Sequence, residues 1–318
     1  MSNSYAIQEV NLDRTFRKTL PSGHYDMVIV SLIHQGTDVL TYLSQNIQRY
    51  VNGKYLWIVH YNAPAAIDES TLPDFVWLVR NLLKTKAEIN LIGGRSNIAL
   101  AHAICRCIEF ALQNITFTNV LLMSSGSSFY RDYTPPSKPY IAINSHELLL
   151  HENRNAPHTD PVPTEKIEHI VDYLNSRGST IPGWQYRYFE KDFQIHPMFR
   201  KFKWLHGGQW SGMIFPYDVA KEVARDMKPM ESISNNPSMP DYALEEIVFA
   251  TYAYNYAIEN GLKLNISETI IDWDRQYTIP IDQIKNYRII ASIFPGIGHM
   301  VCKIPYEIGE IHRFLLLR

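Results

Sequence analysis

The sequence predicts an α/β fold in which a doubly wound, mostly parallel sheet is flanked by helices. Short apolar runs rich in β-branched residues alternate with helix-type segments through the first 130 residues, which is typical of parallel strands covered on both faces. The later apolar runs end in turns rich in Gly, Ser or Asn. A chain of 318 residues with 46% hydrophobic content is long enough for one large domain or two small ones, with an ample core.

The first half of the chain contains four predicted strands and three predicted helices. Residues 27–34 form a continuous apolar run, which predicts a buried strand. Gly36 and Asp38 open a helix that ends near Tyr50. The further predicted elements are a strand at 54–60, a helix at 72–86, a strand at 88–92, a helix at 98–112 and a strand at 119–123.

Polar turns follow three of these strands. They contain Asn62, the Gly-Gly-Arg-Ser-Asn turn at 93–97 and the Ser-rich loop at 124–128. Ligands of doubly wound sheets bind outside the carboxyl ends of the strands. We therefore expect a nucleotide at this edge, bound by a half-domain that spans residues 26–134 after a lead at 1–25.

The second half of the same predicted domain, residues 135–318, begins with a different amino-acid composition. Prolines, histidines and aromatic residues dominate from 135 to 203, with one predicted helix at 164–176. Such a loop-rich segment suits recognition of a variable second substrate. A strand at 205–215 and a helix at 217–227 follow.

Two adjacent carboxylates, Glu245 and Glu246, begin an otherwise apolar helical pattern in the stretch 239–251. Successive helical side chains point about 100° apart, so the two acids cannot share one environment. The acid at the edge of the buried face would lose solvent, its pKa would rise, and it would be a candidate general base. The alternative is that both acids complement the positive end of the helix dipole.

Composition limits the class of protein. The formal net charge is −2 and no run of Lys or Arg occurs, which argues against a nucleic-acid-binding surface. No apolar stretch is long enough to span a bilayer, and three cysteines without metal-type spacing favour a reducing compartment. We expect a cytoplasmic protein without an export signal; the sequence leaves open peripheral membrane association and the oligomeric state.

Several familiar motifs are absent. His146 and His151 are five residues apart rather than four, so they do not form a helical zinc site. No Gly-x-Gly-x-x-Gly loop and no serine nucleophile elbow occur. Asp272 and Asp274 have the spacing of a metal-diphosphate site, but they do not follow a strand of the nucleotide half. Without a metal, cations must neutralise a diphosphate; the candidates are Arg275, Arg288 and Lys303.

The ordered set of short segments resembles the core-2/I-branching glycosyltransferase family, which includes branching N-acetylglucosaminyltransferases and peptide xylosyltransferases. The resemblance spans about residues 26 to 307, and the combination is more specific than any single piece. Its segments are Val59-His-Tyr-Asn62, Arg95-Ser-Asn-Ile-Ala-Leu-Ala101, Leu121-Leu-Met-Ser-Ser-Gly-Ser-Ser-Phe129, Gly208-Gln-Trp-Ser-Gly-Met-Ile-Phe215, Glu245-Glu-Ile-Val-Phe-Ala-Thr251, Ile271-Asp-Trp273 and Met300-Val-Cys-Lys303.

The resemblance implies a GT-A fold and an inverting, metal-independent transfer of a sugar, GlcNAc or xylose, from a UDP-sugar to a glycan hydroxyl, with no cofactor. It assigns Glu246 as general base and Lys303, with Arg275 or Arg288, to the diphosphate. The other expected donor-binding residues are His60, Asn62, Arg95, Ser96, Gly126 and Ser128, and the expected acceptor-binding residues are Glu245, Gln209, Trp210, Trp184 and Tyr186.

The chain also departs from the family pattern. Asn62 and Ser128 stand where the family has aspartates, and Glu245 replaces the usual aspartate beside the base. The absence of a membrane anchor and of a disulfide framework favours a bacterial-type enzyme that builds a surface glycan. Because of the lost aspartates, a non-catalytic protein that binds glycans or nucleotide sugars is the alternative.

Overall fold

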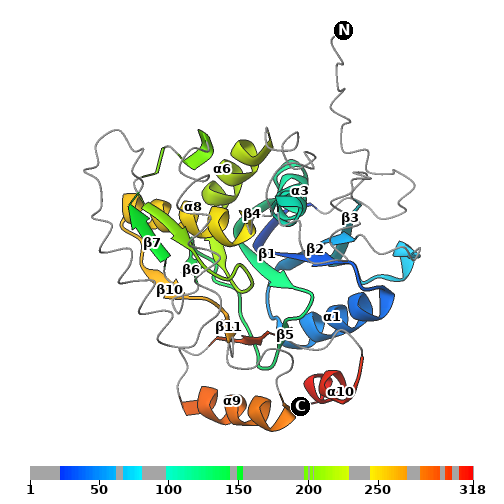
Figure 1. Cartoon of the computed structure of the whole chain (residues 1–318). Coiled ribbons are helices and arrows are strands. Elements are labelled where there is room, and N and C mark those ends of the chain that lie inside the picture. Colours follow the sequence, from blue (N-terminus) through cyan, green and yellow to red (C-terminus); the bar gives the residue numbers. More distant parts are fainter. Residues whose placement is uncertain are drawn as a thin grey trace.

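A computed structural model describes residues 22–61, 67–80, 98–143, 149–152, 197–199, 201–202, 204–228, 244–270, 280–293, 298–302 and 308–317. These residues form a mixed α/β structure around a seven-stranded sheet (Figure 1). Its strand order is β10-β6-β9-β4-β1-β2-β3. The predicted α/β class with a mostly parallel sheet is confirmed.

The parallel half of the sheet contains β3, β2, β1 and β4. Three of these strands confirm the predicted apolar runs, because their central residues are shielded from solvent on both faces. The bounds are His24–Ile33 for β1, Tyr55–Tyr61 for β2, Val76–Arg80 for β3 and Thr116–Ser124 for β4.

The helix predicted at 72–86 is wrong where the structure describes it, because 76–80 form strand β3 beside β2. Val76, Trp77, Leu78 and Val79 are consecutive and all buried. A continuous apolar run of this kind fits a strand covered on both faces, and periodicity alone cannot separate it from a buried helix. The strand predicted at 88–92 lies outside the described residues.

The other half of the sheet is mixed. Strand β9 (Ile214–Pro216) runs antiparallel between β4 and β6 (Ile141–Ile143), and β10 (Leu264–Ile266) pairs parallel with β6. The single strand predicted at 205–215 is therefore two strands. Its first part, β8 (Trp204–Gly207), pairs antiparallel with β7 (Leu149–Glu152) away from the central sheet.

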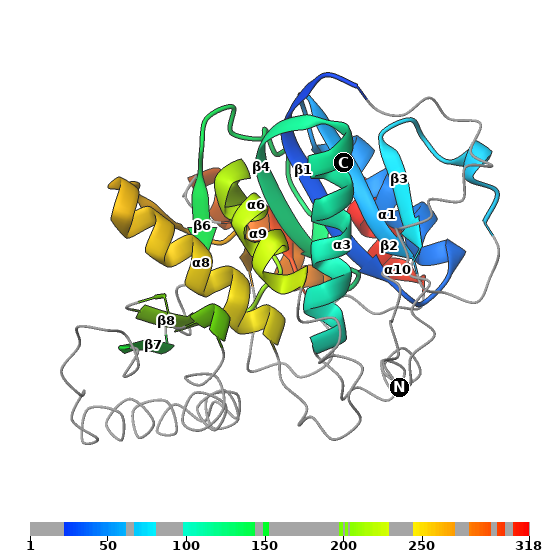
Figure 2. The same cartoon turned by 90° about the horizontal axis from the view of Figure 1, so that it is seen from above.

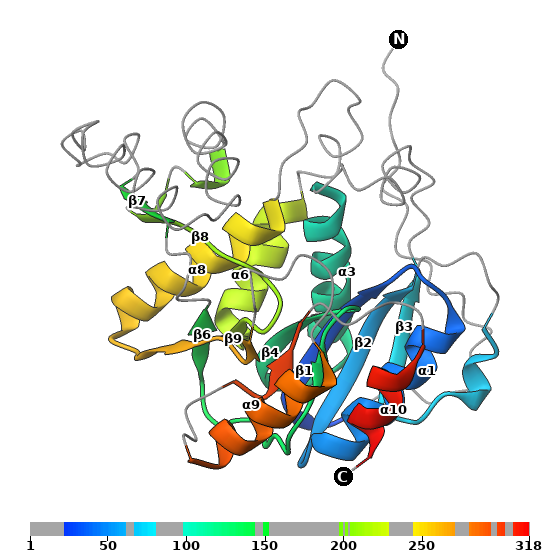
Figure 3. The same cartoon turned by 60° about the horizontal axis from the view of Figure 1, so that its bottom comes forward.

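Helices cover both faces of the sheet (Figures 2 and 3). One core cluster joins α3, α6 and α8 to the strand residues Val28, Val30 and Leu32, and a second joins α1 to Met27 and Ile29 on the opposite face. The predicted helices at 98–112 and 217–227 are confirmed. The bounds are Thr37–Tyr50 for α1, Ile98–Asn114 for α3, Tyr217–Met227 for α6, Leu244–Asn260 for α8 and Glu310–Leu316 for α10, which packs on α1.

A small second sheet lies below the central one, with strand order β11-β12-β5 and α9 (Ile281–Ile293) beneath it (Figure 1). It brings together segments more than 100 residues apart in the sequence. The strands are β5 (Ser128–Phe129), β11 (Thr269–Ile270) and β12 (Met300–Val301). Elsewhere in the chain, η1 (Glu69–Thr71) and η3 (Pro197–Phe199) are short 3-10 helices. No described helix is long and apolar enough to cross a bilayer.

Candidate functional site

The candidate site is at the carboxyl end of β4, where the chain leaves the sheet at Ser124. The loop before β9 lies directly against this end, since the Gly212 amide donates to the Leu122 carbonyl (2.7 Å) and the Leu122 amide donates to the Met213 carbonyl (2.9 Å). The Ser124 amide also donates to the Ser211 hydroxyl (3.1 Å). The predicted Ser-rich loop and the segment 208–215 are therefore neighbours.

Gly212 allows this close approach. Its φ of +87° lies in the left-handed region that favours glycine, and a Cβ there would come within 2.6 Å of the Thr269 backbone nitrogen. The Glu268 amide in turn donates to the Gly212 carbonyl (2.9 Å). The turn thus joins the end of β4 to the strand β11.

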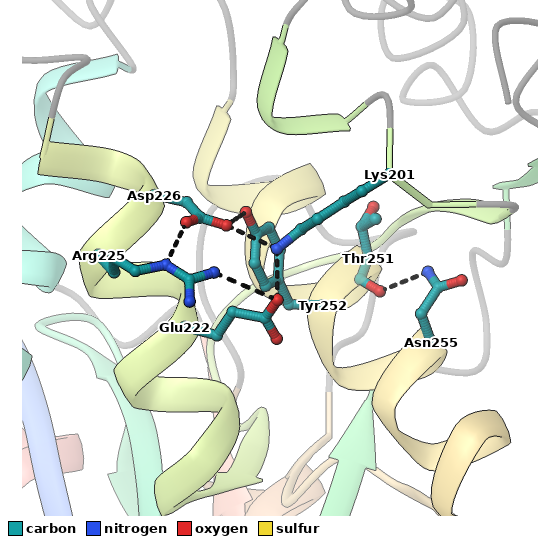
Figure 4. Close-up of polar contacts among 7 residues, drawn as sticks. All are labelled: Lys201, Glu222, Arg225, Asp226, Thr251, Tyr252 and Asn255. Carbon is teal, nitrogen blue, oxygen red and sulfur yellow. Dashed lines mark hydrogen bonds and ion pairs between the residues drawn. The ribbon is translucent and has the colours of Figure 1, made fainter. Parts of the chain in front are cut away.

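Thr251 holds α8, the helix that begins with Glu245 and Glu246, against β8. Its buried hydroxyl accepts from the His206 amide (3.0 Å) and donates to the His206 carbonyl (3.1 Å). Asn255 donates to the Thr251 carbonyl (2.8 Å) one turn further on, as Figure 4 shows. The Gly208 amide then donates to the Glu246 carbonyl (2.9 Å). The start of α8 is thereby tied to the loop that reaches β4.

The two carboxylates have different environments, as the 100° spacing predicts. Glu245 is 4% exposed and its Oε2 atom has no hydrogen-bond partner among the described residues. Burial, with a smaller contribution from the adjacent Glu246, raises the pKa of Glu245 well above its usual range. The neutral form of Glu245 is therefore favoured, whereas Glu246 is partly exposed. Of the two, only Glu246 is accessible from solvent.

The segment that precedes Lys303 reaches the same place. Strand β12 pairs antiparallel with β5, with Met300 opposite Phe129 and Val301 opposite Ser128. The Cys302 Sγ atom is 3.9 Å from the Ser124 Oγ atom. Lys303 itself lies outside the described residues, but the residue before it borders the Ser-rich loop.

Hydroxyl groups occupy the loop after β4. The Ser127 hydroxyl lies 2.7 Å from that of Ser124 and 2.9 Å from that of Ser211, so the three form one hydrogen-bonded chain. Tyr42 donates to the Ser128 hydroxyl (2.8 Å). Gly126 and Ser128 are buried within this loop. No group of three or more metal-ligating side chains occurs among the described residues.

His60, Trp210 and Arg288, which were predicted to line the site, are built into the fold, as are the buried Gly126, Ser128 and Glu245. His60 is 4% exposed, and burial lowers its pKa to about 4. Trp210 is 8% exposed and belongs to the core beneath α3, α6 and α8. Gln209, beside it, is only partly buried and stays available to a ligand.

Arg288 is held within the fold by hydrogen bonds and by an aromatic ring. Its Nε atom donates to the Tyr130 carbonyl (3.0 Å) and its Nη2 atom donates to the Tyr50 hydroxyl (3.0 Å). Its guanidinium lies 4.7 Å from the centre of the Phe314 ring. Arg288 was expected to contact a diphosphate. In the structure it holds α9 against the segment after β5 and against α1 and α10 instead. Outside the described residues lie Asn62, Arg95, Ser96, Trp184, Tyr186, Asp272, Asp274 and Arg275.

A polar cluster that the sequence did not predict holds the segment just before β8 (Figure 4). Lys201 forms ion pairs with Glu222 and with Asp226 (2.6 Å), and it lies 4.5 Å from the centre of the Tyr252 ring. Burial alone would raise the pKa of Asp226, but hydrogen bonds from Arg225, Lys201 and Tyr252 outweigh it and lower the pKa to about 2. The cluster joins α6, α8 and the strand that carries His206. Glu222, Arg225 and Asp226 lie together on α6, and Lys201, 21 residues before Glu222, joins them only through the fold.

No family model matches the chain, and no curated protein matches it closely enough to count as a relative. The functional interpretation therefore depends on the residues and their geometry.

Proposed function

We propose that the chain is an inverting glycosyltransferase of GT-A-like architecture that transfers a sugar from a UDP-sugar to a glycan hydroxyl without a metal ion. GlcNAc and xylose are the favoured sugars. The observation that carries the proposal is convergence: the Ser-rich loop, the segment at 208–211 and the strand before Lys303 meet at the carboxyl end of β4, and the Gly208 amide ties the start of α8 to that segment. All four are segments of the family resemblance.

The sheet supports this architecture. Four parallel strands form a nucleotide-type half, and the antiparallel β9 begins the other half directly beside β4. The strand order reverses next to β1: β2 and β3 extend from one side of β1, whereas β4 lies on its other side. Ligands of open α/β sheets bind outside the carboxyl ends of strands at such a switch point.

Glu246 is the proposed general base. A base must be ionised and accessible, and the partly exposed Glu246 meets the second condition while the buried Glu245 does not. The raised pKa of Glu245 favours its neutral form, which reduces the repulsion between the two carboxyl groups. In the reaction, Glu246 removes the proton of the acceptor hydroxyl as that oxygen attacks the anomeric carbon. The bond to the UDP oxygen breaks in the same displacement, which inverts the anomeric centre.

Cations stabilise the departing UDP in this mechanism. Lys303 follows Cys302, which borders the loop after β4. Arg288 is engaged by Tyr130, Tyr50 and Phe314, so Arg275 is the better partner for Lys303. Positive side chains at the diphosphate replace the charge that a metal ion would otherwise supply.

The decisive test is Glu246→Gln, compared with Glu259→Gln on an exposed position of the same helix. UDP release is measured with UDP-GlcNAc or UDP-xylose and a panel of glycan acceptors, and UDP binding is measured by calorimetry. Glu246→Gln should lose transfer by at least about 100-fold, since general-base catalysis contributes about 10²–10⁴-fold, while UDP binding persists. Normal turnover in this variant, or strict dependence on added Mn²⁺, would overturn the proposal.

A non-catalytic glycan- or nucleotide-sugar-binding protein is the second candidate. The observation in its favour is that Ser128, at the position of a family aspartate, is buried and hydrogen-bonded to Tyr42. Binding of UDP-sugars without release of UDP, with or without acceptors, would support this candidate. A metal-dependent transferase that uses Asp272 and Asp274 would instead lose activity on addition of EDTA.

A further inference from the structure

The hydroxyl of Thr251 binds both backbone groups of one strand residue. It accepts a hydrogen bond from the His206 amide (3.0 Å) and donates one to the His206 carbonyl (3.1 Å). Thr251 is fully buried on α8, and His206 is fully buried on β8. One side chain therefore satisfies a backbone donor and a backbone acceptor, each of which would cost free energy if it were buried without a partner.

These bonds lie on the edge of β8 that faces α8, since the opposite edge pairs with β7. The amide of Gly208, two residues after His206, points to the same edge and donates to the Glu246 carbonyl (2.9 Å). Alternate residues of an extended chain direct their backbone groups to the same edge. The segment 206–208 therefore runs along α8 and is attached to it at two points, Glu246 and Thr251.

Two points of attachment fix both the position and the angle of the strand on the helix. Glu246 and Thr251 are five residues apart, which corresponds to a rise of about 7.5 Å along α8. A single bond would let the strand pivot about it, whereas two bonds at this separation do not. The two side chains point about 140° apart around the helix. Thr251 therefore faces β8, while the side chain of Glu246 stays partly exposed.

The same segment continues to the carboxyl end of β4. The Ser211 hydroxyl accepts from the Ser124 amide (3.1 Å), and the Gly212 amide donates to the Leu122 carbonyl (2.7 Å). Residues 206–212 are therefore bonded to α8 at one end and to β4 at the other. The position of α8 relative to the loop after β4 depends on this connection.

We propose that Thr251 is a positioning residue, whose hydroxyl sets the distance of Glu246 from the loop after β4. The inference rests on the proposed function, because it concerns the general base and the sugar donor of that reaction. Thr251 is fully buried, so it acts through Glu246 and not by touching a substrate. Without its hydroxyl, the His206 amide and carbonyl would be left unpaired, and the segment 206–208 would move. A displacement of about 1 Å at a reacting group can lower a rate about 100-fold.

The test compares Thr251→Val, which keeps a similar shape but removes the hydroxyl, with Thr251→Ser, which keeps the hydroxyl. In steady-state assays with a UDP-sugar and a glycan acceptor, Thr251→Val should lower kcat about 10- to 100-fold and change KM for the UDP-sugar less than about twofold. Thr251→Ser should restore kcat to within about twofold of wild type. The stoichiometry of UDP binding in calorimetry gives the concentration of folded protein, so unfolded protein does not count as lost kcat.

The matched control is Asn119→Ala, near the amino end of β4. Asn119 is fully buried, donates to the Pro136 and Lys138 carbonyls (2.9 Å each) and accepts from the Tyr140 amide (2.9 Å). The variant therefore also breaks hydrogen bonds between a buried side chain and the backbone, but none to the segment 206–212. It should lower the midpoint of thermal unfolding, as Thr251→Val does, while its kcat stays within about twofold of wild type.

Hydrogen exchange tests the attachment without any reaction. The His206 and Gly208 amides should exchange at least about tenfold faster in Thr251→Val than in wild type, and at nearly the wild-type rate in Asn119→Ala. Wild type that releases no UDP with any acceptor would overturn the proposed function, and the positioning role with it. Three results with an active wild type would overturn the positioning role alone: unchanged kcat in Thr251→Val, unchanged exchange of the two amides in that variant, or an equal loss of kcat in Asn119→Ala.

Discussion

Protonation of His206 should destabilise the fold in mild acid. The His206 ring is fully buried near Tyr254, 5.3 Å between ring centres, and neither ring nitrogen has a hydrogen-bond partner among the described residues. Burial lowers the pKa of His206 from 6.5 to about 4, against a smaller opposing effect of the Gly207 backbone. The folded ring therefore stays neutral at a pH where the unfolded chain already binds a proton.

The sign and the size of the effect follow from these two values. Stability should be unaffected above pH 6.5, fall as the pH drops from 6.5 to about 4, and change no further below that. The interval corresponds to a loss of about 3 kcal/mol, since one pH unit is worth about 1.4 kcal/mol per proton.

The variant His206→Phe removes this titration, keeps a flat ring and breaks no side-chain hydrogen bond. Guanidinium unfolding at several pH values between 8 and 4 gives the free energy of unfolding of both proteins. The difference between variant and wild type should grow by about 3 kcal/mol in favour of the variant as the pH falls. His60→Phe provides a parallel case, because burial lowers the pKa of His60 to about 4 as well. A His206→Phe protein with the wild-type pH dependence would refute the reasoning.

Three further predictions concern the site. Glu245→Gln should stabilise the protein at pH 7 to 8 and change little near pH 4, because the folded carboxyl stays protonated above its ordinary pKa of 4.5; thermal unfolding at both pH values checks this. Gly212→Ala should cost about 2–5 kcal/mol through backbone strain and the clash with Thr269, whereas Gly261→Ala, at φ +61° with open space around it, should cost only about 1–2 kcal/mol in denaturant unfolding. Arg288→Met should cost about 1–3 kcal/mol of stability, because it removes the hydrogen bonds to Tyr130 and Tyr50, yet leave the UDP affinity measured by calorimetry unchanged. A stably folded variant with lower UDP affinity would instead show that Arg288 binds the diphosphate.

The sequence by itself determined the α/β class and most of the regular elements that the structure describes. Strands β1, β2 and β4 and helices α3 and α6 appear where their patterns predicted them, because a continuous apolar run or a 3.6-residue period is a local property of the chain. The same local rule failed at 76–80. There, a run of four buried residues suits a strand as well as a helix, and only the neighbouring β2 decides between them.

Only the tertiary structure decided what each candidate side chain contacts. The spacing of Glu245 and Glu246 required two environments, but the packing of α8 buried the first and left the second accessible. Arg288 pairs with groups 158 and 238 residues away in the sequence. Which side chains of α9 are exposed likewise depends on the face that the core covers. A local pattern can show that a residue suits burial or charge, whereas its partners come from segments that meet only after folding.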